Sequence, residues 1–515
     1  MPTTDSVRTW AEGIFALPYQ KEGAMETAPF TPIDSAHAPL KRELGLPTAT
    51  ALVVGNMIGS GIFLLPASLA AVALVSGSGS LLAWALTGLG AMLLAAVFAT
   101  LGRAYPRTGG PYVFAHRAFG NFIGFQTAWG YWIAAWAGNA AIAIAFTGYL
   151  TVFWTSLANS KIAMAGVTIA LVWLLTLVNI LGVRETGIVQ LVTTVLKFVP
   201  LLLIGIVGLF YMQADNFTPF APNGLGTGNG MWGGITAAAA LTLWAFIGLE
   251  SATVPAEEVK NPEKTIPRAT MLGTLVTTLV YIVATVAIIG IVPLGRLADS
   301  SSPFAAAAST MFGGAWGKVV AAVALISVFG CLNGWILIQG RVPLGAAKDG
   351  LFPERFARVH GQRGTPVFGL VVSSLLISAL ILMNYSKGLV DQFTFIILLA
   401  TLTTVVPYAF AAAAEVYLFI TERERFVARR LIRPTIVATL GFAYAIFAIW
   451  GIGWDIIGKG FLLLMVGIPV FVYMAWRHRS APKTLAAREP TAISVSDMPP
   501  LVVSEPRRPL PSEGR

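Results

Sequence analysis

Cysteine and histidine are scarce in this chain of 515 residues, and their scarcity excludes several kinds of site. The single thiol, Cys331, lies inside an apolar segment, so neither an internal disulfide nor a cysteine cluster around a metal can form. No histidine lies near the centre of an apolar segment; the four are His37, His116, His360 and His478. Catalysis within a membrane would need a cluster of His, Asp or Glu. We therefore expect no enzyme activity, no cofactor and no metal site.

Charge is the second shortage. Only 11% of the residues are charged and 56% are hydrophobic, whereas soluble domains contain about 25% charged residues. Apolar stretches of about 20 residues or more recur along the chain, each long enough to cross a bilayer. Twelve of them are centred near residues 60, 90, 136, 172, 200, 243, 281, 331, 374, 404, 444 and 467. The sequence predicts an all-α polytopic membrane protein with twelve transmembrane helices.

The charges that are present, with a net value of +10, concentrate in alternate connections between these spans. Lysine and arginine gather before the first span, near residues 102–121, 182–189, 255–268, 341–363 and 421–433, and after residue 476. The positive-inside rule then predicts a multi-pass protein of the cell inner (plasma) membrane with both termini in the cytoplasm. The basic balance reflects topology and contact with anionic lipid, so no nucleic-acid partner is expected.

Composition divides the chain into four regions. Residues 1–43 are predicted to form a cytoplasmic tail that lacks the features of a signal peptide. Residues 44–413 hold helices 1–10, and residues 414–478 hold a cytoplasmic loop and accessory helices 11 and 12. Residues 479–515 are rich in Pro, Ser and charge, which is typical of a disordered tail.

The run GNMIGSGIF at residues 55–63 is the most informative feature of the chain. It places three glycines, an Asn and a Ser in the middle of the first span, where lipid offers no partners for loose backbone. A helix that breaks at this depth exposes N–H and C=O groups, which suit the carboxylate and ammonium of an amino acid. The pattern therefore favours a secondary transporter, with tight helix packing through Gly55 and Gly59 as the alternative.

The run WAFIGLESA at residues 244–252 interrupts the sixth span in a similar way. Two interrupted spans five helices apart indicate an inverted repeat of spans 1–5 and 6–10, with discontinuous helices 1 and 6. Glu250 and Lys197 are the only ionisable residues that we place clearly inside the spans. Because an anion is costly there, Glu250 is expected to change protonation as a gate moves and to link transport to pH. A permanently protonated hydrogen-bond donor is the alternative.

Five stretches together resemble the amino acid–polyamine–organocation (APC) superfamily, most closely its basic amino acid/polyamine antiporters, such as the bacterial arginine/agmatine antiporter. The resemblance covers about residues 44–476. It implies a LeuT-like core of five plus five helices that exchanges one amino acid or amine for another by alternating access. The stretches are GNMIGSGIFLLPA (55–67), YW with WAGN (131–139), TLWAFIGLESA (242–252), KNP with a later proline (260–267), and GW followed by DGLFP (334–353).

The resemblance also implies which residues meet the substrate. The backbone of the first break would receive the carboxylate and amino group, and two tryptophans would cover the pocket and stack on a guanidinium or aliphatic stem. Such stacking is worth about 0.5–2 kcal/mol. The substrate-binding residues so implied are Met57, Ser60, Gly61, Asn139, Trp244, Ile247, Trp335 and Ala400. Two of them have an alternative explanation: Asn139 as a tie between helices and Trp335 as a packing or lipid-facing residue.

Tyr131, Glu250 and Tyr408 are similar to the gating hydrogen-bond set of this superfamily. Lys197 departs from the arginine/agmatine branch, but in other superfamily members a lysine there resembles a replacement for sodium. Sodium coupling is therefore not expected, and Lys197 is either a proton carrier or a lysine that snorkels to the interface. Ala400 and Ile142 stand where the antiporter has Ser and Met, which makes the far end of the pocket more apolar.

Two functions remain open on this evidence. The first is a sodium-independent exchanger of a basic amino acid for an amine or amino acid. The alternative is a proton-coupled or broad-specificity permease for neutral amino acids. Expected partners are these substrates and the lipid bilayer. A homodimer stays open, and a disulfide-linked accessory subunit has no support because the one thiol lies within a span.

Overall fold

The computed structural model describes residues 42, 44–71, 77–107, 109–181, 193, 196–198, 201–217, 230–361, 363–426 and 432–480. The predicted N-terminal tail apart from Arg42, and residues 481–515 of the predicted C-terminal tail, lie outside these described residues. The chain divides into a unit that ends at Met474 and a second one from Ala475. The fold and the sites below belong to the first unit.

The regular secondary structure of the described residues is helical, apart from one isolated bridge between Leu44 and Val259. Prolines in the first turn open α2, α5, α9 and α11, where a missing N–H leaves no bond unmade. The α-helices are α2 (Leu46–Met57), α3 (Ser60–Ala71), α4 (Gly77–Ala104), α5 (Pro111–Leu150), α6 (Lys161–Leu181), α8 (Gly230–Trp244), α9 (Pro262–Ile291), α10 (Leu294–Ala298), α11 (Pro303–Phe312), α12 (Gly314–Lys348), α13 (Val367–Asn384), α14 (Leu389–Thr421), α15 (Ile432–Ile452) and α16 (Trp454–Ser480).

Ten helical segments of the described residues are long and apolar enough to cross a membrane, which confirms a polytopic helical protein. The first of them, Leu46–Ala71, joins α2 and α3. The predicted fifth and sixth spans correspond to two shorter apolar helical stretches, Leu196–Tyr211 and Gly233–Trp244. Part of the fifth falls outside the described residues, so the count of twelve stays a prediction.

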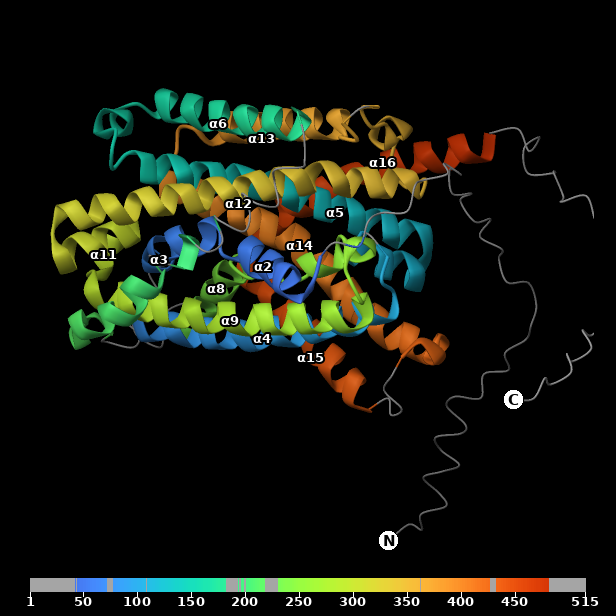
Figure 1. The fold of residues 1–515 in the computed structure, drawn as a ribbon, viewed down its shortest axis with the longest axis horizontal. Helices are drawn as coiled ribbons and strands as arrows, with labels where there is room; N and C mark the ends of the chain where they lie inside the picture. Colours follow the sequence, from blue (N-terminus) through green and yellow to red (C-terminus); the bar gives the residue numbers. More distant parts are fainter. Residues whose placement is uncertain are drawn as a thin grey trace, which may run out of the picture. The chain divides into compact units, whose positions relative to one another are not determined.

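The interrupted helices occupy the interior. Figure 1 shows α2, α3 and α8 between the paired helices α4 and α9 and the helices α5 and α12. In the most apolar window of Leu46–Ala71, 94% of the residues are buried, compared with 33% in that of Ile432–Ile452. The outer helices therefore present apolar side chains to lipid, and the irregular backbone lies where protein can satisfy it.

Helix α14 differs from the predicted division of the chain. It continues through residue 413, where the transport core was expected to end, and stops only at Thr421. As a result Glu415 lies within a candidate span and is 1% exposed. Glu415 is thus a buried ionisable residue, like Glu250 and Lys197.

Candidate functional site

The C-terminal end of α2 lies in the interior, and its last carbonyls have partners from elsewhere in the fold. Helix geometry leaves such carbonyls without intrahelical donors. Here each donor belongs to a different segment: Lys197 Nζ donates to the Gly55 oxygen (2.7 Å), Trp335 Nε1 to the Asn56 oxygen (3.3 Å) and the Tyr281 hydroxyl to the Met57 oxygen (2.5 Å). The break between α2 and α3 is thus stabilised by three side chains distant in the sequence.

The second break follows α8, and the same tyrosine reaches it. The Tyr281 hydroxyl also lies 3.0 Å from the Ala245 oxygen, so one hydroxyl bridges both interruptions. Gly248 has a φ of 114°, and a Cβ at this position would lie 3.1 Å from the backbone carbonyl carbon of Asn56. Asn56 Nδ2 in turn donates to Ser251 Oγ at 2.9 Å. The two interrupted segments are therefore in direct contact and share hydrogen bonds.

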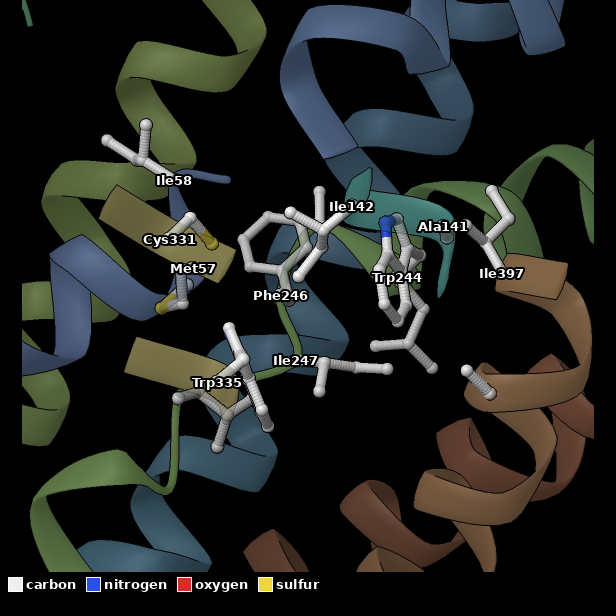
Figure 2. Packing of buried hydrophobic residues seen from close by; sticks show 14 of the residues in the cluster. Met57, Ile58, Ala141, Ile142, Trp244, Phe246, Ile247, Cys331, Trp335 and Ile397 are labelled. Atoms are coloured by element: carbon white, nitrogen blue, oxygen red, sulfur yellow. The ribbon is translucent and has the colours of Figure 1, made fainter. Parts of the chain in front are cut away.

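A small cavity lies between these breaks and α5 and α12. Its volume is about 20 Å³, which is room for about one water molecule. Trp244 is packed closely against α5, because a Cβ on Gly138 would lie only 2.6 Å from its indole ring. The lining residues are Asn56, Met57, Gly59, Ser60, Gly61, Ala134, Gly138, Ile142, Trp244, Ile247, Cys331 and Trp335, several of which are labelled in Figure 2.

The polar groups at this cavity have opposite character on its two sides. The first turn of α3, at Ser60 and Gly61, has N–H groups without intrahelical acceptors and about half a positive charge from the helix dipole. The Ser60 hydroxyl is buried and has no hydrogen-bond partner within the described part of the chain. The end of α2 presents carbonyl oxygens, and those of Gly55 and Asn56, with one donor each, keep a second lone pair. One side suits a carboxylate and the other an ammonium group.

Lys197 is buried, and its ammonium group lies at the negative end of the α2 dipole. A cation in the last turn of a helix is favourable for that reason. The buried ammonium therefore has a structural partner, and it occupies the interior position beside the first break that sequence reasoning expected.

Glu250 lies three residues beyond Ile247, and two tyrosines converge on it. The Tyr131 hydroxyl donates to Oε1 at 2.5 Å, and the Tyr408 hydroxyl donates to Oε2. The Gly248 N–H also donates to Oε2, at 3.1 Å. The structure thus brings together all three residues of the expected gating set, on α5, α14 and the segment after α8.

Two of the predicted substrate-binding residues lie away from the cavity. Asn139 Nδ2 donates to Gln339 Oε1 at 2.7 Å, and Gln339 Nε2 lies 3.3 Å from Ser374 Oγ. Asn139 thus ties α5 to α12, which was its alternative role. Ala400 is buried in α14, where its carbonyl oxygen accepts from Thr404. The predicted Met57, Ser60, Gly61, Trp244, Ile247 and Trp335 all line the cavity.

Sequence reasoning missed other residues of this region. Tyr281 is the most important, since its hydroxyl joins the two breaks, and its only signal was a phenol in the middle of an apolar span. Cys331 was noted only as a thiol, but a Cβ at Gly59 would lie 2.4 Å from its sulfur. Glu415 was taken as part of a loop, and one of its carboxyl oxygens is buried without a partner among the described residues.

The fold and the site define a multi-pass helical membrane protein whose small cavity lies between interrupted helices, an arrangement of secondary transporters. The family model for amino acid permeases matches residues 44–472. The chain therefore belongs to the amino acid permease family within the APC superfamily, as the sequence motifs predicted.

Curated relatives agree with this membership. The chain is 33% identical over 424 residues to the putative arginine/ornithine antiporter of Bacillus subtilis, covering 78% of the chain and 90% of the relative. It is 33% identical over 431 residues to the putrescine transporter PotE of Escherichia coli K12, covering 82% and 94%. It is 36% identical over 375 residues to the cadaverine/lysine antiporter of the same strain, covering 72% and 82%.

Proposed function

We propose that this protein is a secondary transporter that exchanges a basic amino acid, such as arginine, for an amine or another amino acid by alternating access and without sodium. The names of the three relatives support antiport of basic amino acids and amines. The observation that carries the proposal is the cavity between two interrupted helices, with helix ends of opposite polarity and tryptophans at its walls.

The substrate would be held by backbone at one end and by aromatic rings at the other. The carboxylate would meet the first turn of α3 at Ser60 and Gly61, and the ammonium the carbonyls near Met57 and Ile247. No acidic residue is among those that line the cavity, so Trp244 and Trp335 would contact the cationic side chain through their π faces. An amine lacks the carboxylate but keeps the contact between its cationic group and the tryptophan rings. The same site would therefore bind either substrate.

Sodium independence is supported by Lys197. Its ammonium already supplies a positive charge at the end of α2, 2.7 Å from the Gly55 oxygen. A sodium ion needs several oxygen ligands, and like charges at close range repel. Since the side chain is buried, the charge cannot move to the surface while α2 and the fifth span stay packed.

The gate would be the cluster of Tyr131, Glu250 and Tyr408, because it joins α5 and α14 to the segment just beyond the cavity. A substrate larger than a water molecule cannot enter the cavity of this conformation, so the gate or Trp244 has to move. Asn139 would reach a substrate only if its bond to Gln339 broke.

The topology we propose is the twelve-span, LeuT-like one, with helices 1–10 in two inverted repeats and both termini in the cytoplasm. Two observations support it: α2 and α3 form one interrupted span, and α8 ends at Trp244 in the middle of another. The shorter stretches Leu196–Tyr211 and Gly233–Trp244 would supply the fifth and sixth spans.

A proton-coupled permease for neutral amino acids is the second candidate. It is favoured by the apolar wall that Ala134 and Ile142 contribute to the cavity, since a guanidinium finds no hydrogen-bond acceptor there. In that case Lys197 would be the group that carries the proton.

Uptake by proteoliposomes distinguishes the two functions. Labelled arginine, lysine, ornithine, putrescine and leucine would be offered without sodium to vesicles that are empty or preloaded with arginine or putrescine. Uptake of basic substrates only into loaded vesicles supports the exchanger. Uptake of leucine into empty vesicles under a proton gradient supports the permease, and equal uptake by protein-free vesicles would contradict both.

A further inference from the structure

A second cavity lies at the end of α4, far along that helix from the interrupted segments. Its volume is about 340 Å³. It is lined by the last turns of α4, by Pro267 of α9, by the segment that follows α14 and by Pro434 of α15. The lining residues are Ala99, Thr100, Arg103, Ala104, Pro267, Arg425, Phe426 and Pro434. Two arginines thus face a cavity whose other walls are apolar apart from Thr100.

One acidic residue neutralises only part of this positive charge. Glu422 accepts from Arg117 Nε at 2.7 Å and from Arg425 Nε at 3.1 Å. Arg103 has no hydrogen-bond or ion-pair partner within the described residues. Arg103, Arg117 and Arg425 thus outnumber the two nearby carboxyl groups, Glu422 and the buried Glu415, which hydrogen-bonds to Thr100 of the cavity wall.

The guanidinium of Arg425 is held in place. Its Nε donates to Glu422, and its central carbon lies 5.4 Å from the centre of the Tyr105 ring. Tyr105 itself donates to Glu422 at 3.1 Å. A donor that is fixed before a ligand arrives loses less conformational entropy on binding. The remaining N–H groups of Arg425 are thus available in a defined position.

An apolar track leads away from the cavity along α4. Leu89, Leu93, Ala96, Thr100 and Arg103 follow one another at intervals of three or four residues, so they share one face of the helix. None of them is buried, and Leu89 is 62% exposed. Both α9 and α15 pack on α4, one on either side of the cavity. The track is therefore a lipid-facing surface that begins at two arginines.

We propose that this cavity binds the phosphate head group of an anionic glycerophospholipid. Arg103 and Arg425 bind the phosphodiester through charge-assisted hydrogen bonds, and an acyl chain follows the α4 track. Basic pockets between membrane helices on the cytoplasmic side bind such head groups, and the charge pattern of the sequence assigns this end of α4 to the cytoplasm. The bound lipid links α4, α9 and α15.

The test is native mass spectrometry and thermal unfolding of the full chain in detergent, titrated with phosphatidylglycerol, phosphatidylcholine or inorganic phosphate. Each arginine near an anionic head group is worth about fivefold in affinity, so Arg103→Gln with Arg425→Gln should weaken phosphatidylglycerol binding by roughly 25-fold. The matched control changes Arg355 and Arg358, two exposed arginines outside the cavity, to Gln and should alter binding less than about twofold.

Because Arg425→Gln also removes an ion pair, weaker lipid binding by this variant could result from misfolding. A second variant tests the cavity without removing an arginine. Ala104→Leu keeps both arginines and narrows the cavity of about 340 Å³, and it should reduce the preference for phosphatidylglycerol over phosphatidylcholine. Equal binding of the two lipids by the unchanged protein, or full phosphatidylglycerol binding by both variants, would overturn the proposal. Competition by inorganic phosphate at the same concentration as the lipid would assign the site to a free anion and would also overturn it.

Discussion

The change Tyr281→Phe tests whether one hydroxyl holds the end of α2 and the segment after α8 in their relative positions. The ring would stay in place, because it packs against Trp84 and Phe246 with ring centroids 5.2 and 5.5 Å apart. Only the hydroxyl is lost, whose single proton is shared between the Met57 and Ala245 oxygens. The perturbation is therefore confined to two buried carbonyls at the breaks.

The expected loss of stability depends on which hydrogen-bond donors each carbonyl oxygen keeps in the variant. The Met57 oxygen retains the Gly59 N–H at 2.9 Å, so it loses about 0.5–1.5 kcal/mol, the value of an ordinary hydrogen bond. The Ala245 oxygen is left to find a new donor in a buried place, which costs about 1–3 kcal/mol. Because one proton serves both carbonyls, we expect the variant to be less stable by about 1–3 kcal/mol. It should also lose most of its exchange activity, because the helix ends at the cavity shift.

Tyr149→Phe is the matched control. Tyr149 is buried like Tyr281, and its hydroxyl donates to the Phe63 oxygen at 2.8 Å, within α3 and away from the breaks. It should lose stability by about 1 kcal/mol and keep exchange within about twofold. Thermal unfolding with and without arginine, together with exchange in proteoliposomes, measures both effects. Identical exchange by the two variants would refute a special role of Tyr281.

Three further predictions concern single side chains. Trp335→Leu should weaken binding of a cationic substrate by about fivefold through the lost cation–π contact, whereas Trp316→Leu, at an exposed position of the same helix, should not; equal effects would make Trp335 structural. Lys197→Met leaves the Gly55 oxygen without its donor, so uptake or its dependence on pH should be lost while the protein still folds, and unchanged uptake between pH 5 and 8 would contradict the proposed role. Hydrogen bonding from Arg117 holds the pKa of Glu422 below its ordinary value of 4.5. Its ion pairs therefore stabilise the protein at neutral pH, and that stability should fall as pH drops below 4.5; a Glu422→Gln variant with the same acid response would refute the assignment.

The sequence was sufficient to find the interrupted helices because their composition contradicts their surroundings. Polar groups and irregular backbone are costly in lipid unless protein or a cavity satisfies them. The first span contains three glycines with Asn56 and Ser60, and the sixth contains Glu250 near Gly248. The place of Lys197 beside the first break was implied by the resemblance to other members of the superfamily. The six predicted cavity residues come from these two motifs, with Trp335 added from α12.

The differences between the expected and the observed positions come from helix rotation and from contacts between distant segments. Gly138 and Asn139 belong to one motif, but neighbours on a helix differ by about 100°. Gly138 consequently faces Trp244 while Asn139 faces Gln339. Tyr281 lies 224 residues from Met57 in the chain, and a uniformly apolar span gives no indication of which face carries a hydroxyl donor. Glu415 was missed because α14 extends beyond the predicted end of the core.

The small volume of the cavity, about 20 Å³, sets a limit on how the proposed transporter can work. Entry of an amino acid would require movement of the proposed gate or of Trp244, and we infer that the three side-chain contacts at the end of α2 would also have to change. The hydrogen bonds from Trp335 and Tyr281 contribute about 0.5–1.5 kcal/mol each and the one from the Lys197 ammonium about 1.5–3 kcal/mol. A substrate with micromolar to millimolar affinity supplies about 4–8 kcal/mol. Substrate binding can therefore offset the loss of all three contacts, but an empty site has nothing to offset it. An empty transporter with these contacts intact stays closed, which is the behaviour that obligatory exchange needs.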